Sequence, residues 1–173
     1  VRFLNGLTLH EGDAVGSVNE DYIRRLQIRE TIRTHLERER QLYGQNIKVL
    51  SLFFIDHVDS YILYEGEDSK GKFAKMFEEE YNRVLSEMLP SFTDEAYLRY
   101  LSDPRNAASK VHKGYFSMDK KSKMVESKER QGENEERAFD LIMKDKERLL
   151  SLSEPVRFIF SHSALKEGWD NPN

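Results

Sequence analysis

Hydrophobic residues recur with the period of amphipathic helices in four segments of the chain. We expect helices over residues 20–43, 73–88, 96–101 and 134–150, where apolar side chains stand three or four positions apart among charged ones. Gly44 follows the first segment and is expected to end its helix. The positions assigned to the buried face of that first helix are Leu26, Ile28, Ile32, Leu36 and Leu42.

Three shorter runs have the composition of strands. Residues 47–55 are nearly continuously apolar, as in a parallel strand covered on both faces, and residues 156–160 form a similar run. Residues 111–116 predict a short strand that contains a glycine. Because these strands alternate with the helices, we expect a layered α/β fold with a largely parallel sheet.

The chain is expected to form one main domain with an extension at its start. Residues 1–18 contain Asn5-Gly6, a strong signal for a tight turn between two strands, and predict a small N-terminal β-hairpin. Residues 19–173 make up the domain, and residues 117–133 within it are almost wholly polar, which predicts an insertion without regular structure. The chain begins with Val and stops abruptly, so we expect a piece of a larger protein.

Composition narrows the classes of protein that fit. Charged residues make up 34% of the chain, the formal net charge is −4 and the mean hydropathy is −0.72. A freestanding DNA-binding domain usually has a basic balance, so any contact with nucleic acid must be local. The absence of cysteine excludes disulfides, thiolate zinc sites and Cys nucleophiles. No apolar stretch is long enough to cross a membrane, and we expect a cytoplasmic protein with no metal site of its own.

The end of the last predicted strand has the richest candidate site. Ligands of open parallel sheets bind at the carboxyl ends of the strands. Ser163 could cap a helical turn whose N–H groups point at a phosphate, Gly168 could end that turn, and Asp170 could accept hydrogen bonds from a pair of hydroxyls. The structural alternative is a strand, a capped turn and Trp169 packed into the core.

Two other strand ends are weaker candidates. His112, Lys113 and Gly114 could bring a cation and an open backbone to a phosphate; alternatively, they form a solvated strand edge with a turn. Asp56 and His57 could act as an acid–base pair; alternatively, Asp56 caps a helix.

The sequence lacks the motifs of several enzyme classes. It contains no Gly-x-x-x-x-Gly-Lys-Ser/Thr, no Gly-x-Gly-x-x-Gly and no nucleophile elbow. Glu126 and Lys128 match half of a common nuclease site, but they lie in a charge run with no strand pattern to hold them. We therefore expect no catalytic residue in this chain.

The segment Val156–Asn173, with Ser-His-Ser-Ala-Leu-Lys-Glu-Gly-Trp-Asp-Asn-Pro at its centre, closely resembles the motif V region of the Res subunit of type III restriction-modification enzymes. Residues 47–56, 77–81, 111–117 and 141–150 resemble the same family in the same order. The resemblance extends over about residues 20–173.

This resemblance implies the second of two RecA-like domains of a superfamily 2 helicase motor. Such a domain has three layers and the P-loop-NTPase type of fold, and here it would be incomplete. ATP would bind between the two domains, with Mg²⁺ held mainly by the missing first one. The intact motor would act on double-stranded DNA together with a modification (Mod) subunit. Its expected activities are ATP-dependent DNA translocation and type III site-specific DNA cleavage.

The resemblance also implies roles for individual residues. Gly168 and Asp170 match the family's Gly-x-Asp, in which the carboxylate hydrogen-bonds the ATP ribose or couples the nucleotide site to the DNA. The usual Thr of motif V, which contacts the DNA backbone, aligns with His162 between Ser161 and Ser163, so that role is shared among the three.

Lys113 and Gly114 would face the nucleic acid in the same family. The P-loop, the Asp-Glu box, the arginine-bearing motif and the nuclease domain of the family all fall outside this chain, so we expect the chain alone to be inactive. The alternative is a non-catalytic α/β module that binds nucleic acid or a partner.

Overall fold

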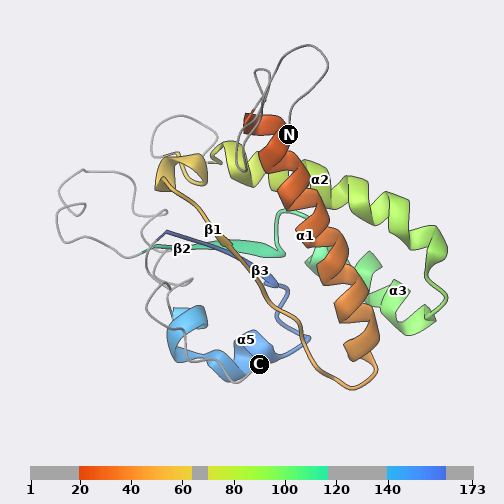
Figure 1. Ribbon diagram of the computed structural model, residues 1–173. Coiled ribbons are helices and arrows are strands. Elements are labelled where there is room, and N and C mark those ends of the chain that lie inside the picture. The colour runs from red at the N-terminus through yellow and green to blue at the C-terminus, as the bar shows by residue number, and fades with distance from the viewer. Residues whose placement is uncertain (1–19, 64–69, 117–139, 163–173) are drawn as a thin grey trace, which may run out of the picture.

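The described part of the protein is an α/β fold with three strands. The computed structural model describes residues 20–63, 70–116 and 140–162. The elements in chain order are α1 (Glu20–Tyr43), β1 (Ser51–Phe54), α2 (Lys72–Met88), α3 (Glu95–Ser102), β2 (His112–Phe116), a π-helix (Asp140–Lys144), α5 (Lys146–Leu150) and β3 (Phe158–His162) (Figure 1). The predicted N-terminal hairpin over residues 1–18 and the polar insertion over residues 117–133 lie outside the described residues.

The three strands are parallel and have the order β1-β3-β2. β3 is therefore central, and Phe158 at its start lies opposite Ser51 of β1 and His112 of β2. All three strands begin at one edge of the sheet, which we call the amino edge. They end at the other, the carboxyl edge, at Phe54, Phe116 and His162. The predicted α/β fold with a parallel sheet is confirmed and is consistent with part of a RecA-like domain.

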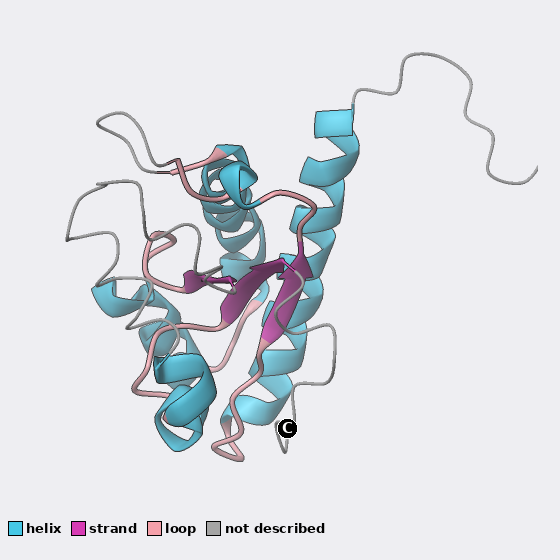
Figure 2. Ribbon diagram, turned by 90° about the vertical axis from the view of Figure 1, so that its left-hand side faces the viewer, coloured by secondary structure: helices cyan, strands magenta, loops and turns pink. Residues whose placement is uncertain are grey.

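Alternate residues of the central strand form the cores on the two faces of the sheet. Phe158 and Phe160 are fully buried on the face covered by α1 and α2, where the ring of Phe160 stacks on Phe53 with centroids 4.7 Å apart. Ile159 points to the opposite face and belongs to a smaller core with Leu149 of α5. This alternation, which is inherent in a strand, gives the helix–sheet–helix layers (Figure 2).

The helix ends have local causes that can be read from the sequence. Asp94 precedes α3, and its carboxylate accepts from the backbone N–H of Ala96 at 2.9 Å and of Tyr97 at 3.1 Å. α1 ends at Tyr43, as predicted, but the left-handed residue of the following turn is Asn46, with φ of 57°, and not Gly44. Asn tolerates this conformation better than most residues, because its short polar side chain can hydrogen-bond locally.

Two predicted elements differ in extent from the observed ones. The predicted strand over residues 47–55 is shorter in the structure, where β1 contains only Ser51–Phe54, and Lys48 before it donates to the carbonyl of Leu149 in α5. The predicted strand over 156–160 is shifted to β3, so that Ser161 and His162 belong to the strand itself.

Two helix predictions also need correction. The second half of the predicted helix 134–150 is interrupted at Asp145, whose carboxylate accepts from the N–H of Arg148 and starts α5 anew. Leu26, which the periodicity assigns to the buried face of α1, is 42% exposed. Leu26 lies near the N-terminus of α1, where Tyr22 and Ile23 are exposed as well.

Candidate functional site

The carboxyl edge of the sheet brings together part of the predicted DNA-binding set. Ser161 is the fourth residue of β3 and lies opposite Phe54 of β1 and Tyr115 of β2. Its side chain is fully buried, and its carbonyl accepts from the N–H of Ile55 at 2.9 Å. Its hydroxyl, however, has no hydrogen-bond partner among the described residues. A buried hydroxyl of this kind usually has a partner, so Ser161 is the unsatisfied polar group of this edge.

His162 ends β3 opposite Phe116 and is partly exposed. It is the last described residue, and Ser163, Gly168 and Asp170 all lie outside the described residues. The parallel sheet thus positions Ser161 and His162 at the edge where ligands of such sheets bind. Their contact with DNA and the nucleotide role of Gly168 and Asp170 stay predictions.

Lys113 and Gly114 lie on adjacent positions of β2 and therefore on opposite faces of the sheet. Lys113 is opposite Ile159, which places it on the same face as Ser161, and it is half-buried. Gly114 is on the other face, opposite Phe160. Because β2 is a regular strand here, the side chain of Lys113 and the Cα of Gly114 do not face the same ligand from one surface.

Gly114 has a packing reason to be glycine. A Cβ atom there would lie 2.4 Å from Cε2 of Phe116 and 2.7 Å from Cε1 of Tyr61. Contacts this short require the rings to move. The glycine is therefore needed for the aromatic packing of the sheet, whether or not its backbone also meets nucleic acid.

His112, at the start of β2, forms a buried chain of hydrogen bonds that the sequence did not reveal. Its Nδ1 lies 2.7 Å from the hydroxyl of Tyr61, and its Nε2 lies 3.2 Å from a carboxylate oxygen of Glu78 on α2. Because a carboxylate only accepts, Nε2 donates to Glu78 and Nδ1 accepts from Tyr61. Lys70 extends this chain of hydrogen bonds with an ion pair to Glu78 at 2.7 Å.

Burial lowers the pKa of His112. The imidazole is only 7% exposed, so it does not bring a cation to the surface. That finding favours the structural alternative for this residue. No sequence signal points to Tyr61 or Glu78 as its partners, since they lie 51 and 34 positions away.

A second buried cluster occupies the amino edge, around Arg157. The guanidinium is fully buried; Nη1 donates to Glu39 of α1 at 2.5 Å and Nη2 to the hydroxyl of Tyr81 at 2.5 Å. Tyr97 of α3 also donates to Glu39, at 2.9 Å. Burial opposes the charged form of Glu39, but Arg157, His35 and Tyr97 together outweigh it and hold the pKa of that carboxyl below its usual value.

His35 completes this amino-edge cluster. Its Nδ1 lies 2.9 Å from the hydroxyl of Ser51, and its Nε2 lies 3.6 Å from Glu39. Burial lowers the pKa of His35. The cluster is closed to solvent and links α1, α2 and α3 to the beginning of the sheet, so its role is structural.

Asp56 and His57 do not form an acid–base pair. The carboxylate of Asp56 is largely exposed and forms an ion pair with Arg24 of α1 at 3.1 Å. His57 is exposed and precedes a short 3-10 turn, which its side chain does not cap. The Arg24–Asp56 ion pair therefore links the segment after β1 to α1.

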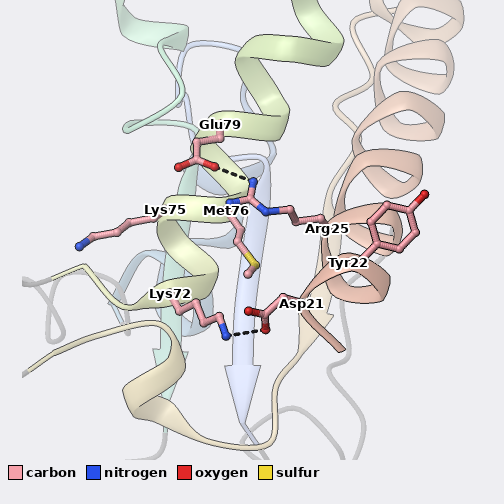
Figure 3. Close-up of a pocket in the computed structure, with 7 residues that line it drawn as sticks. All are labelled: Asp21, Tyr22, Arg25, Lys72, Lys75, Met76 and Glu79. Atoms are coloured by element: carbon pink, nitrogen blue, oxygen red, sulfur yellow. Dashed lines mark ion pairs between the residues drawn. The ribbon is translucent and has the colours of Figure 1, made fainter. Parts of the chain in front are cut away.

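A groove of about 470 Å³ lies between the first turns of α1 and α2 (Figure 3). Its charges are largely paired: Lys72 contacts Asp21, and Arg25 contacts Glu79 at 2.5 Å. Exposed pairs of this kind contribute little to stability. The internal pairing leaves the groove with little net attraction for an anion.

Within residues 20–63, 70–116 and 140–162, no three His, Asp or Glu side chains converge to hold a metal ion. In the same ranges no helix has the length and apolar character needed to cross a bilayer. Gly168 and Asp170, which the resemblance assigns to ATP, lie outside them.

Comparison with known proteins identifies relatives along almost the whole chain. It is 38% identical over 172 residues to the Res subunit of the Escherichia coli type III restriction-modification enzyme EcoP15I, and 37% identical over 172 residues to that of EcoPI from Escherichia phage P1. The Res subunit of StyLTI from Salmonella typhimurium is 32% identical over 201 residues. Each alignment includes 98% of this chain. No protein-family model matches it.

The chain spans 17% of the length of the first two relatives and 18% of the third. Over 98% of its length, the chain is homologous to one segment of the Res subunits of type III restriction-modification enzymes.

Proposed function

We propose that this chain is the second motor domain of a type III restriction enzyme, which helps to couple ATP hydrolysis to translocation along double-stranded DNA. The homology to Res subunits over 98% of the chain is the observation that supports it most strongly. The position of Ser161 and His162 at the carboxyl edge of a parallel sheet supports it further, because ligands of such sheets bind there.

In this proposal the closing segment has two tasks. Ser161, His162 and Ser163 position a DNA phosphate, and Gly168 and Asp170 hold the ribose of ATP or couple its site to the DNA. ATP and its Mg²⁺ supply the phosphoryl chemistry when bound, and the Mg²⁺ is held mainly by another domain. The protein acts in the cytoplasm together with a modification subunit. The chain alone neither hydrolyses ATP nor cleaves DNA.

The substitution Asp170→Ala in the full-length protein tests the coupling role. A hydrogen bond to a charged group contributes about 1.5–3 kcal/mol, so we expect DNA-stimulated ATP hydrolysis to fall by about tenfold or more. Asp59→Ala is the matched control, because Asp59 is an exposed carboxylate after the end of β1. Unchanged stimulation and unchanged translocation in Asp170→Ala would remove this role from Asp170.

The competing function is a non-catalytic module that binds nucleic acid or a partner. It predicts DNA binding by the full-length protein with no ATP hydrolysis that depends on DNA. Measurement of both quantities on one preparation separates the two functions.

A further inference from the structure

Tyr61 joins the segment after β1 to the outer strand β2. We call residues 55–63 and 70–71, the two described arms between β1 and α2, the β1–α2 connection. The carbonyl of Tyr61 accepts from the N–H of Gly71 at 2.7 Å, which links the two arms. The hydroxyl of Tyr61 donates to Nδ1 of His112 at 2.7 Å, which links the connection to β2. One residue thus ties the connection to itself and to the sheet.

The ring of Tyr61 packs on the part of β2 that the family resemblance places towards nucleic acid. A Cβ atom on Gly114 would lie 2.7 Å from Cε1 of Tyr61, so the ring lies directly against that backbone. The ring centroid is also 4.7 Å from that of Phe160 in the central strand, and Tyr61 is only 7% exposed. The second arm is packed as closely, because a Cβ atom on Gly71 would lie 2.6 Å from the carbonyl oxygen of Asp59. Close packing therefore holds both arms of the connection in place.

His112 links this anchor to α2. Its Nε2 donates to Glu78 at 3.2 Å, and Lys70 of the second arm pairs with the same carboxylate at 2.7 Å. The order of hydroxyl, imidazole and carboxylate matches that of a nucleophile triad. Tyr61 is not a nucleophile, however, because burial raises the pKa of its hydroxyl and closes it to a substrate. The chain of hydrogen bonds therefore positions the connection and performs no chemistry.

The β1–α2 connection begins where ligands of parallel sheets bind. Its first arm follows the end of β1 and so belongs to the carboxyl edge. A loop that is already fixed in its binding conformation loses less conformational entropy when the ligand arrives. The anchor at Tyr61 should therefore change the affinity for a ligand more than the rate of a reaction at saturation.

We propose that Tyr61 is a positioning residue for DNA, which acts through His112 and Gly114 to hold the β1–α2 connection ready to bind at the carboxyl edge. The inference rests on the proposed motor function, since that function makes double-stranded DNA the ligand. Tyr61 itself stays buried and does not contact the DNA.

The substitution Tyr61→Phe in the full-length protein tests the proposal, because it removes the hydroxyl and keeps the ring. We expect the dissociation constant for double-stranded DNA, measured by fluorescence anisotropy, to rise about three- to tenfold, the size of one hydrogen bond. The DNA concentration at half-maximal ATP hydrolysis should rise equally, while the rate at saturating DNA stays the same. His112→Gln should have a similar effect, and the double variant should be no weaker than either, because both substitutions break the same link.

Tyr81→Phe is the matched control, since it also removes a buried hydroxyl, the one that accepts from Arg157 at the amino edge. It should lower the thermal unfolding midpoint without changing the affinity for DNA. An unchanged dissociation constant in Tyr61→Phe, or an equal rise in both variants, would overturn the proposal.

The unsubstituted protein separates this proposal from the motor function. If DNA does not stimulate its ATP hydrolysis, the motor function is overturned, and the anisotropy measurement still decides the role of Tyr61. If it binds no DNA, both are overturned.

Discussion

The two edges of the sheet differ in how deeply their side chains are buried. At the amino edge, Arg157, Glu39 and Tyr97 form a fully buried network with bonds of 2.5 and 2.9 Å. At the carboxyl edge, the buried hydroxyl of Ser161 has no partner within the described ranges, and Phe54 is 53% exposed. Helices of this chain close the amino edge, although Nε of Arg157 and Oε1 of Glu39 also lack hydrogen-bond partners there, so unsatisfied groups are not confined to the carboxyl edge.

This difference separates a structural edge of the sheet from the edge that carries the candidate binding residues. Ionic groups at the amino edge are protected from water by three helices, so their partners must come from within the chain. The carboxyl edge is the side of a parallel sheet where ligands bind. The proposed DNA contact of Ser161 and His162 would lie at that edge.

The largest effect should follow from breaking the ion pair at the amino edge. Glu39→Gln leaves the guanidinium of Arg157 buried without its counter-charge, which typically costs about 3–5 kcal/mol of unfolding free energy. Glu37→Gln on the same helix is the control, because Glu37 is exposed, and it should change stability by less than about 0.5 kcal/mol. Urea unfolding measures both, and a loss below about 1 kcal/mol in Glu39→Gln would mean that the pair does not stabilise this edge.

Replacement of Gly114 by alanine should have the next largest effect. The added Cβ would lie 2.4 Å from the ring of Phe116, and overpacking of this kind costs about 1–3 kcal/mol. Gly44→Ala is a matched control, since nothing lies within 4 Å of its Cβ position. Equal thermal unfolding midpoints for the two variants would contradict the packing role, and Phe116→Leu should partly rescue Gly114→Ala.

The pH dependence of stability tests the link from Lys48 to α5. Three carbonyls accept from its Nζ, but burial outweighs them and lowers the pKa of Lys48 to about 7. In the unfolded chain the Lys48 ammonium keeps its proton up to its ordinary pKa of 10.5. Between pH 7 and pH 10.5 the unfolded chain therefore binds more protons than the folded protein. Stability from this group therefore rises with pH, by about 1 kcal/mol between pH 7 and pH 8.

Urea unfolding at these two pH values, on the unsubstituted protein and on Lys48→Met, measures that contribution. The rise should disappear in Lys48→Met and persist in Lys110→Met, whose side chain is exposed. A rise of the same size in Lys48→Met would show that another group titrates.

The smallest effect should come from Lys113, the second residue of β2. If its ammonium contacts a DNA phosphate, Lys113→Gln should weaken binding to all sequences equally and reduce the slope of log affinity against log salt by about 1. Lys110→Gln, two residues before β2, is the control and should keep the original slope. An unchanged slope in Lys113→Gln would remove this residue from the DNA surface.

Much of the secondary structure could be predicted, because local patterns specify it. The bounds of α1 agree with the periodicity of residues 20–43, and α3 extends the predicted helix over 96–101 by one residue at each end. The interruption of the last helix at Asp145 was missed, since an Asp inside a helical period does not by itself indicate a new helix start. Leu26 was wrongly placed because periodicity cannot show how far a neighbouring element extends.

The candidate site was only partly predictable for a different reason. Ser161 and His162 were found from the motif after an apolar run, and they do lie at the carboxyl edge. The motif could not show that Ser161 is buried, or that Gly114 is needed for packing against Tyr61. The partners of His112 and Arg157 lie 34 to 118 positions away, beyond the reach of any local pattern.

The sequence by itself determined the helices, the approximate strands, the parallel α/β class and the likeness to Res subunits, because each depends on neighbouring residues or on a contiguous motif. Only the tertiary structure decided the strand order β1-β3-β2, the burial of Arg157 with Glu39, and the exposure of Phe54. These depend on which distant segments meet, and the low dielectric between them decides which charges must pair.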